Sequence, residues 1–274
     1  MARCFALLLP LAVCLFPSCK QPSLPQERAK FTQHETGVAE EKAEVTEEEA
    51  RAAEERAIKT ILRLGGTVRW LQNGHAIAVD AKDTVITDAI LKELKKLKAL
   101  QEVCLEGTEV TDAGLGDLGE LKDLEYLSLA NTRITDAGLK KLKGLNRLCI
   151  LLLWGTKVTD AGLAELKELK GLKWLDLCGT KVTDGGLAQL RQLKGLEALE
   201  LEGTEITDAG LKELKEIKGL YRLTLWRTQI TDVGLKELKE LNGLKMLDLR
   251  GTKVTVSGIE NLQWALPAAK IYGP

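Results

Sequence analysis

The most constraining feature of the sequence is a threonine that returns every 24 residues. From residue 87 to residue 255 it occupies the same place in a repeated motif, without one insertion or deletion. Such a strict period means that every unit has the same length and the same local structure, so successive units can stack in register. The threonines are Thr87, Thr111, Thr135, Thr159, Thr183, Thr207, Thr231 and Thr255.

The unit at residues 172–195 contains two hydrophobic periods. In its first half Leu175 and Leu177 alternate with residues of other kinds, which is the period of a β-strand. In its second half leucine recurs every third residue, which predicts a short helix with one apolar stripe. Thr183 and Asp184 precede this helix and are expected to cap its N-terminus.

Four units carry the same pentapeptide, Thr-Asp-Ala-Gly-Leu, at residues 111–115, 135–139, 159–163 and 207–211. With these motifs the chain resembles the 24-residue leucine-rich repeats of bacterial envelope and cytoplasmic proteins, and also the repeats of eukaryotic F-box adaptors. The resemblance implies an α/β fold, a right-handed leucine-rich-repeat solenoid of the ribonuclease-inhibitor type. In this fold a parallel β-sheet forms the concave face and short helices form the convex face. The fold does not specify a function, because it serves many.

A single unit is too small to fold alone. Burying one large apolar side chain contributes about 1.5–3 kcal/mol, whereas ordering the backbone of each residue costs about 1–2 kcal/mol. Only a stack of units buries both sides of each apolar wedge. A second column of threonines is expected to form a ladder that satisfies backbone groups of the loops. These are Thr84, Thr108, Thr132, Thr156, Thr180, Thr204, Thr228 and Thr252.

Residues 1–19 have the pattern of a secretory signal. Arg3 is followed by an apolar run that ends at Phe16 and is too short to span a bilayer. Residues 16–19 resemble a bacterial lipobox, although such boxes usually have Leu three residues before the Cys and a small residue two before it. Cys19 is therefore predicted to be lipidated, and the alternative is a leader that is cut elsewhere.

The rest of the chain divides into a tether and one domain. Residues 20–45 contain two prolines and little to bury, and they are predicted to be a disordered tether. A capping box at residues 46–49 is predicted to begin a helix that ends at Gly65, with two strands after it. The leucine-rich-repeat domain thus covers residues 46–274, with an N-terminal cap at 46–75, repeats at 76–267 and a C-terminal cap at 268–274.

The strand positions that point away from the helices are the expected ligand-binding surface. Five of them, Tyr126, Ile150, Leu152, Trp154 and Trp174, are predicted to form an exposed aromatic and aliphatic patch. Exposed apolar patches bind partners, and Trp and Tyr anchor many interfaces. The alternative is that these side chains pack on one another or lie under a terminal segment.

A charged group is expected beside this patch. Carboxylates on adjacent strands repel one another unless a cation lies among them. That cation would be a basic group of a partner or a divalent ion, and the alternative is neutralisation by nearby arginines and water. The residues are Asp176, Glu200 and Glu202, flanked by Arg222, Trp226 and Arg250.

Catalysis is not predicted. The chain has two histidines, His34 and His75, and both lie outside the repeats' sheet positions, so no Ser-His or Cys-His pair can form there. No cofactor motif or metal motif occurs. The net charge of −1 and the pI near 6.3 offer no attraction to nucleic acid. Cys104, Cys149 and Cys178 are predicted to be free thiols, because the repeat spacing keeps them too far apart to pair.

These features predict a non-catalytic protein-protein recognition or scaffolding module. It would be secreted across the inner membrane and lipid-anchored in the bacterial cell envelope, with a protein ligand held on the concave face. The first alternative is a glycan-binding envelope protein whose Trp rings stack on sugars. The second is an intracellular F-box-like adaptor, which the leader disfavours. The sequence leaves open the identity of the partner, the membrane that holds the anchor and the oligomeric state.

Overall fold

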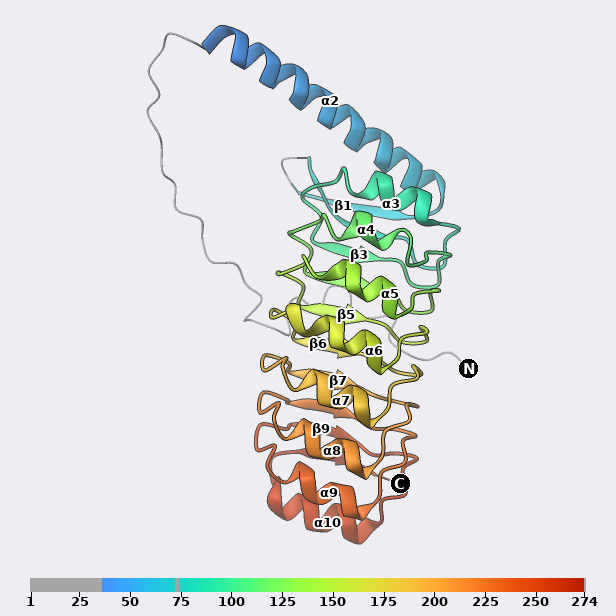
Figure 1. Cartoon of the computed structure of the whole chain (residues 1–274), viewed down its shortest axis with the longest axis vertical. Coiled ribbons are helices and arrows are strands. Elements are labelled where there is room, and N and C mark those ends of the chain that lie inside the picture. The colour runs from blue at the N-terminus through green and yellow to red at the C-terminus, as the bar shows by residue number, and fades with distance from the viewer. Residues whose placement is uncertain (1–35, 72–73, 274) are drawn as a thin grey trace. The chain divides into compact units, whose positions relative to one another are not determined.

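The computed structural model describes residues 36–71 and 74–273, and side chains from residue 48 onward. The chain divides into two compact units, residues 1–48 and 49–274. The second unit is a stack of coils, most of which contribute one strand and one helix (Figure 1). The predicted signal, Cys19 and residues 20–35 of the predicted tether lie outside the described residues.

The strands form one ten-stranded sheet in which spatial order follows chain order. β1 and β2 are antiparallel, and every later neighbour is parallel and in register. The strands are β1 Thr67–Trp70, β2 Ala76–Asp80, β3 Glu102–Cys104, β4 Tyr126–Ser128, β5 Ile150–Leu152, β6 Trp174–Asp176, β7 Ala198–Glu200, β8 Arg222–Thr224, β9 Met246–Asp248 and β10 Lys270–Tyr272.

The helices of the coils all lie on one side of this sheet (Figure 1). The arrangement confirms the predicted α/β solenoid. None of the described helices combines the length and the apolar composition that crossing a bilayer requires. The helices are α2 Thr36–Arg63, α3 Asp88–Leu94, α4 Leu115–Leu118, α5 Asp136–Leu139, η2 Lys140–Leu142, α6 Asp160–Leu163, η3 Ala164–Glu168, α7 Asp184–Leu190, α8 Asp208–Leu214, α9 Asp232–Leu238 and α10 Val256–Ala265.

One continuous apolar core fills the space between the sheet and the helices. In the coil of α7, Leu175 and Leu177 enter it from the strand side and Leu187 and Leu190 from the helix, all fully buried. The equivalent leucines of the other coils belong to the same cluster. Each coil therefore buries its leucines against the coils before and after it, as the repeat pattern predicts.

The first helix differs from the sequence prediction. α2 begins at Thr36, so residues 36–45 are helical and not a disordered tether, and the predicted capping box lies inside the helix. Residues 37–45 consist mainly of Ala, Glu and Lys, which favour a helix. The predicted end is confirmed: the helix stops at Arg63, and Gly65 has the left-handed φ of 92° that commonly ends a helix. Ala57 and Ile61 are fully buried in the core.

The strands expected near both ends of the solenoid are present where the structure describes them. At the N-terminal end, β1 and β2 form the expected antiparallel pair, although Asn73 of the turn lies outside the described residues. At the C-terminal end, α10 stops before Pro267 and β10 pairs in parallel with β9. Trp264 on α10 is 87% exposed, the most exposed large apolar side chain in the described chain.

The aspartate of each repeat binds the threonine of the next repeat. The Thr207 N–H donates to Asp184 Oδ1 at 2.8 Å, and the Thr207 hydroxyl donates to Asp184 Oδ2 at 2.5 Å. Thr207 also caps its own helix by accepting from the Ala209 N–H at 3.3 Å. These bonds form a ladder that links neighbouring coils. Its other rungs join Asp88 to Thr111, Asp112 to Thr135, Asp136 to Thr159, Asp160 to Thr183, Asp208 to Thr231 and Asp232 to Thr255.

The ladder explains the glycine of the pentapeptide. A Cβ atom on Gly210 would overlap Asp184 Oδ1, and its next neighbours, Asp184 Cγ and Leu187 Cδ1, would be 3.0 Å away. The first repeat has Ile90 in this position, and no aspartate stands one repeat before it. The glycine is therefore needed only where an aspartate from the previous coil lies against it.

The second column of threonines acts within each coil. The Thr180 hydroxyl donates to the Leu177 carbonyl at 2.6 Å, and the equivalent threonines make the same bond three residues back. They satisfy loop carbonyls, as predicted. Each of these bonds stays inside its own coil, so this column does not link neighbouring coils.

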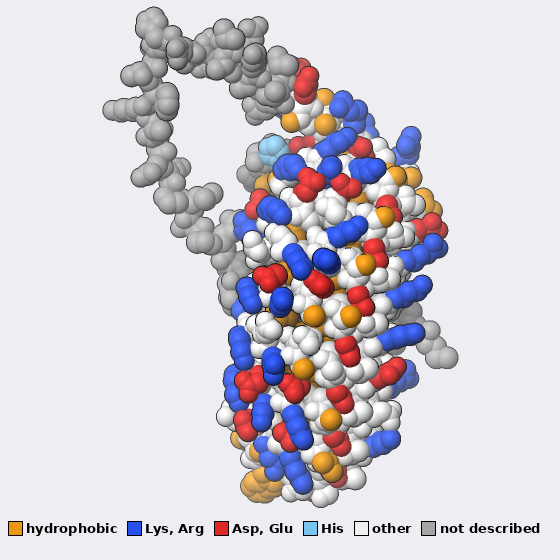
Figure 2. All heavy atoms as spheres, in the orientation of Figure 1, with side chains coloured by type: hydrophobic (Ala, Val, Ile, Leu, Met, Phe, Trp, Pro, Cys, Tyr) orange, Lys and Arg blue, Asp and Glu red, His pale blue; other side chains and the backbone are white. Residues whose placement is uncertain are grey.

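Charged side chains cover the helix side of the solenoid (Figure 2). Ion pairs four residues apart are common on long helices, but the ion pairs of the described residues mostly join neighbouring coils. Lys194 lies 3.4 Å from Glu216 and Lys218 lies 3.1 Å from Glu240, and each pair is 22 residues apart in sequence. The described repeat helices α3 to α9 have only four to seven residues, so the next coil offers a partner more often than the next turn does.

Candidate binding surface

The candidate surface is the side of the sheet that faces away from the helices, here called the sheet face. Two of its columns follow the strand register. One contains Tyr126, Ile150 and Trp174, and the other contains Leu152, Asp176 and Glu200. A third column follows the strands and includes Trp154, Glu202, Trp226 and Arg250, held in line by backbone bonds between coils. The strand register and these backbone bonds therefore align the predicted sheet-face residues on successive coils.

The aromatic and aliphatic patch is less exposed than the sequence predicts. Tyr126, Leu152, Trp154 and Trp174 are only partly exposed, and Ile150 is buried at 4%. Side chains of paired strands lie about 5 Å apart, so large neighbours in one column cover one another. The patch is therefore a packed aromatic band whose outer edges remain accessible, and the expectation of a fully exposed patch is wrong.

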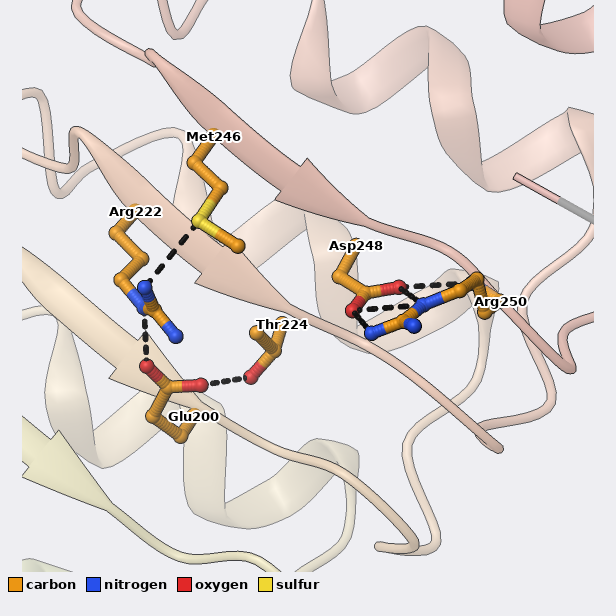
Figure 3. Close-up of polar contacts among 6 residues, drawn as sticks. All are labelled: Glu200, Arg222, Thr224, Met246, Asp248 and Arg250. Atoms are coloured by element: carbon orange, nitrogen blue, oxygen red, sulfur yellow. Dashed lines mark hydrogen bonds and ion pairs between the residues drawn. The ribbon is translucent and has the colours of Figure 1, made fainter. Parts of the chain in front are cut away.

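Glu200 lies at the centre of a polar network on β7 and β8 (Figure 3). Its side chain is nearly buried; Arg222 Nε donates to Glu200 Oε1 at 2.5 Å, and the Thr224 hydroxyl donates to the other carboxylate oxygen. The Arg222 guanidinium also lies 5.8 Å from the centre of the Trp174 ring. The predicted neutralisation by an arginine is therefore confirmed for Glu200.

Arg250 neutralises a different carboxylate from the one that the sequence predicts. It binds Asp248 through Nη2 at 2.5 Å and through Nε at 2.9 Å (Figure 3). Its guanidinium also lies 5.0 Å from the centre of the Trp226 ring, and that of Arg227 lies 4.8 Å from the same ring. Asp248 lies in the same column of the sheet face as Glu200. Its place in the repeat could therefore have identified Asp248 as a member of the charged group. Arg227 lies in the loop after the strand, where its φ is 58°. Strand alternation therefore does not predict its contact with Trp226.

Asp176 and Glu202 are not neutralised in this way. Burial and the charges of Glu200 and Glu202 raise the pKa of Asp176 to about 6, although its carboxylate accepts from the Cys178 N–H at 2.9 Å. Burial also raises the pKa of Glu202, and the charges of Arg227 and Arg250 act against this shift. Among the described residues, no Lys, Arg or His forms an ion pair with either carboxylate. The described residues thus provide no direct ion pair to either carboxylate, and Arg250 acts on Glu202 only through its charge.

The raised pKa of Asp176 predicts a pH-dependent stability. Below pH 3.8 the carboxyl is neutral in both states. Between pH 3.8 and about 6 the unfolded chain ionises first, so folding stability falls as the pH rises. Asp176→Asn is expected to be more stable than the parent protein at pH 7.5 by up to about 3 kcal/mol. The difference in the free energy of unfolding between the two proteins should vanish near pH 4. Urea unfolding at pH 4 and at pH 7.5 measures it.

A control separates this effect from a general change in charge. Asp123 is half exposed and pairs with Arg147 at 3.0 Å on the molecular surface. Asp123→Asn is expected to change stability by no more than about 0.5–1 kcal/mol at either pH. An Asp176→Asn difference that is the same at pH 4 and pH 7.5 would contradict the assignment.

Two of the thiols in the described chain are held in the protonated form by burial. Cys104, Cys149 and Cys178 are thiols that form no disulfide with one another, as predicted. Burial raises the pKa of Cys104 to about 12 and that of Cys178 far above its ordinary value, so neither is a thiolate at neutral pH. His75 lies beside Glu54 at the N-terminal end of the solenoid, away from the aromatic band. Over the described ranges, no group of His, Cys, Asp and Glu side chains has the arrangement of a metal site.

Two segments of the chain match a known family of repeats, and the chain is similar to two solved structures. Residues 121–143 and 195–215 match a family model described as Leucine Rich repeat. No curated protein matches the chain. The chain is similar to the crystal structure of an internalin from Listeria monocytogenes, with 18% identity and a TM-score of 0.49 over 67% of this chain and 65% of that one. It is also similar to internalin C2 of this species, with 24% identity and a TM-score of 0.49 over 65% of this chain and 80% of that one.

The first of these internalins is longer than the similar region, since this chain covers 65% of its length. The two segments that match the family model lie in the coils of β4 and β5 and of β7 and β8. Their 24-residue period continues through the coils on either side. The chain therefore folds as an α/β leucine-rich-repeat solenoid.

Proposed function

We propose that the chain is a non-catalytic recognition or scaffolding module that holds a protein ligand on its sheet face. The observation that carries the proposal is the aromatic band, in which Tyr126, Trp154 and Trp174 lie on three successive coils, with Trp226 two coils further along the same face. Trp, Tyr and Arg are the residues that most often anchor protein interfaces. All of these occur together here, beside the charged groups of β7 to β9.

The surroundings of Trp174 and Trp226 favour a protein ligand over a glycan. A sugar stacks on the flat face of an aromatic ring. Arg222 lies over Trp174, and both Arg227 and Arg250 lie over Trp226. Guanidinium groups thus occupy ring faces that a sugar would need, and they present hydrogen-bond donors to a partner instead.

The experiment places a photo-reactive amino acid on each side of the full chain in cells of its native host. Glu106 and Arg250 flank the aromatic band on the sheet face, and Lys167 and Lys212 lie exposed on the helix side. A partner should be cross-linked from the sheet face and not from the helix side.

Trp154→Ala combined with Trp174→Ala should abolish the sheet-face adduct. Trp264→Ala, which removes the exposed tryptophan of α10, should leave the adduct unchanged. Adducts that form only on the helix side, or that survive the double substitution, would contradict the proposal. Titration with envelope polysaccharides, followed by tryptophan fluorescence, tests the glycan alternative.

We also propose that the module acts at the cell envelope, on the basis of the signal pattern of residues 1–19. A lipid on Cys19 would hold the chain to the membrane surface. In cell fractionation, Cys19→Ala is expected to move the protein from the membrane fraction to the soluble fraction. Cys14→Ala is the matched control and should leave it in the membrane fraction. An unchanged distribution of the Cys19 variant would contradict the anchor.

A further inference from the structure

The sheet face already binds one cation of its own between a ring and a carboxylate. Arg222 lies 5.8 Å from the centre of the Trp174 ring, and its Nε lies 2.5 Å from Glu200 Oε1. The ring attracts the positive charge and the carboxylate forms a charge-assisted hydrogen bond. The positive charge of the guanidinium is therefore stabilised by two different groups, the Trp174 ring and the Glu200 carboxylate, on neighbouring coils.

The same arrangement occurs again one coil later. Arg250 lies 5.0 Å from the centre of the Trp226 ring, and its Nη2 lies 2.5 Å from Asp248 Oδ2. The Asp248 carboxylate is buried, whereas half of the Arg250 side chain is exposed. Two tryptophans of the sheet face thus each have a carboxylate and a guanidinium as neighbours.

Trp154 is the third tryptophan of the sheet face, and it has carboxylates beside it. The Gly155 N–H donates to the Cys178 carbonyl at 2.9 Å, and the Gly179 N–H donates to the Glu202 carbonyl at 2.7 Å. These bonds place Trp154, Cys178 and Glu202 side by side on three neighbouring coils. Asp176 stands two residues before Cys178 and accepts a bond from its N–H. Cys178 therefore lies between Trp154 and Glu202 along this column, and Asp176 stands beside it on the same strand.

The group of Trp154, Asp176 and Glu202 differs from the groups around Trp174 and Trp226, because the described chain places no cation in direct contact with it. No Arg or Lys side chain among the described residues lies over the Trp154 ring, and none forms an ion pair with Asp176 or Glu202. Arg227 and Arg250 act on Glu202 only at longer range. The two carboxylates and the neighbouring Glu200 repel one another. The negative charge of Glu200 contributes to raising the pKa of both Asp176 and Glu202. A cation in this position would relieve the repulsion.

We propose that Trp154, Asp176 and Glu202 bind a guanidinium or ammonium group from a side chain of the partner protein. The inference rests on the proposed function and adds the chemistry of the contact. The partner's Arg or Lys would occupy the place that Arg222 occupies beside Trp174. A divalent ion is a poorer fit, because an indole ring gives it no oxygen ligand.

The test uses N-acetyl-L-arginine amide as a probe of the full chain. Its binding is followed through the indole N–H signals in NMR spectra, which are assigned by replacing each tryptophan with phenylalanine. The Trp154 signal is expected to move in a saturable way. The isosteric but uncharged N-acetyl-citrulline amide should move it at least tenfold less at the same concentration.

Variants locate the probe. Asp176→Asn combined with Glu202→Gln keeps the shapes of the side chains and is expected to weaken binding of the probe at least fivefold. Glu213→Gln on the helix side is the matched control and should leave binding unchanged. An equal response to the citrulline compound, or unchanged binding to the double variant, would overturn the inference.

Cross-linking separates this inference from the proposed function. If Asp176→Asn with Glu202→Gln leaves the sheet-face adduct at the parent yield, a partner binds there without this contact, and the inference is wrong while the function stands. If no partner is cross-linked from the sheet face of the parent protein, the proposed function is wrong. If the adduct is lost in the variant with Asp176→Asn and Glu202→Gln but retained in Glu213→Gln, the result supports both the proposed function and this inference.

Discussion

Gly210→Ala is expected to destabilise the solenoid by about 2–4 kcal/mol, although alanine favours a helix by up to about 1 kcal/mol over glycine. The new methyl group would overlap Asp184 Oδ1 and lie 3.0 Å from Leu187 Cδ1. Asp184 can move away only if it gives up its two bonds to Thr207, each of which contributes about 0.5–1.5 kcal/mol to stability at this exposed site. Urea unfolding followed by circular dichroism measures the change.

Two comparisons identify the cause. Gly116→Ala makes the same change inside α4, where a Cβ atom would meet only Lys141 Cδ at 3.9 Å, and it should be neutral or stabilising by up to about 1 kcal/mol. In the background of Asp184→Ala the overlapping oxygen is absent. Gly210→Ala should there cost at least about 1.5 kcal/mol less than in the parent protein. Equal costs in both backgrounds would contradict the role of the aspartate.

The second large effect is expected from Arg222→Met. This change leaves the nearly buried Glu200 carboxylate without its arginine, and only the Thr224 hydroxyl remains as its partner (Figure 3). Removing one member of a buried ion pair costs about 3–5 kcal/mol in proteins. Since the Arg222 side chain is 20% exposed, water would compensate in part, and we expect a loss of about 2–3 kcal/mol.

The matched variants distinguish a lost charge from lost packing. Glu200→Gln in the Arg222→Met background removes the uncompensated charge and is expected to restore at least half of the stability. Lys218→Met breaks the exposed pair with Glu240 and should cost less than about 1 kcal/mol. A double variant as unstable as Arg222→Met would show that packing of the arginine on Trp174 is the larger contribution.

Several features of the fold were predictable because they depend on local sequence period. The 24-residue spacing, the alternation at Leu175 and Leu177 and the leucines of α7 define one coil, and an identical coil can bury its leucines only against its neighbours. The columns of the sheet face follow from the same period. The cap at Pro267 and the break at Gly65 follow from backbone chemistry that acts within a few residues.

The helix start was mispredicted for a local reason as well. The capping box at residues 46–49 resembles a helix N-terminus, but the alanines and glutamates before it also favour a helix. The sequence offered both starting points, and the structure places the start at Thr36.

The partners of the charged side chains were decided by tertiary structure. Asp184 has the position of an acid in the first turn of its own helix, yet its carboxylate binds Thr207 of the next coil. Lys194 finds Glu216 in the next coil in the same way. These contacts depend on the distance and angle between coils, which no pattern within one repeat contains.

The sequence by itself determined that the chain stacks identical coils and which residues line its sheet face, because apolar period and strand alternation are properties of each repeat. Only the tertiary structure decided that Arg222 pairs with Glu200, that Arg250 pairs with Asp248 and that Ile150 is buried. The physical reason is that charge pairing and burial are set by side chains on adjacent coils, whose reach and direction emerge only when the coils are packed together.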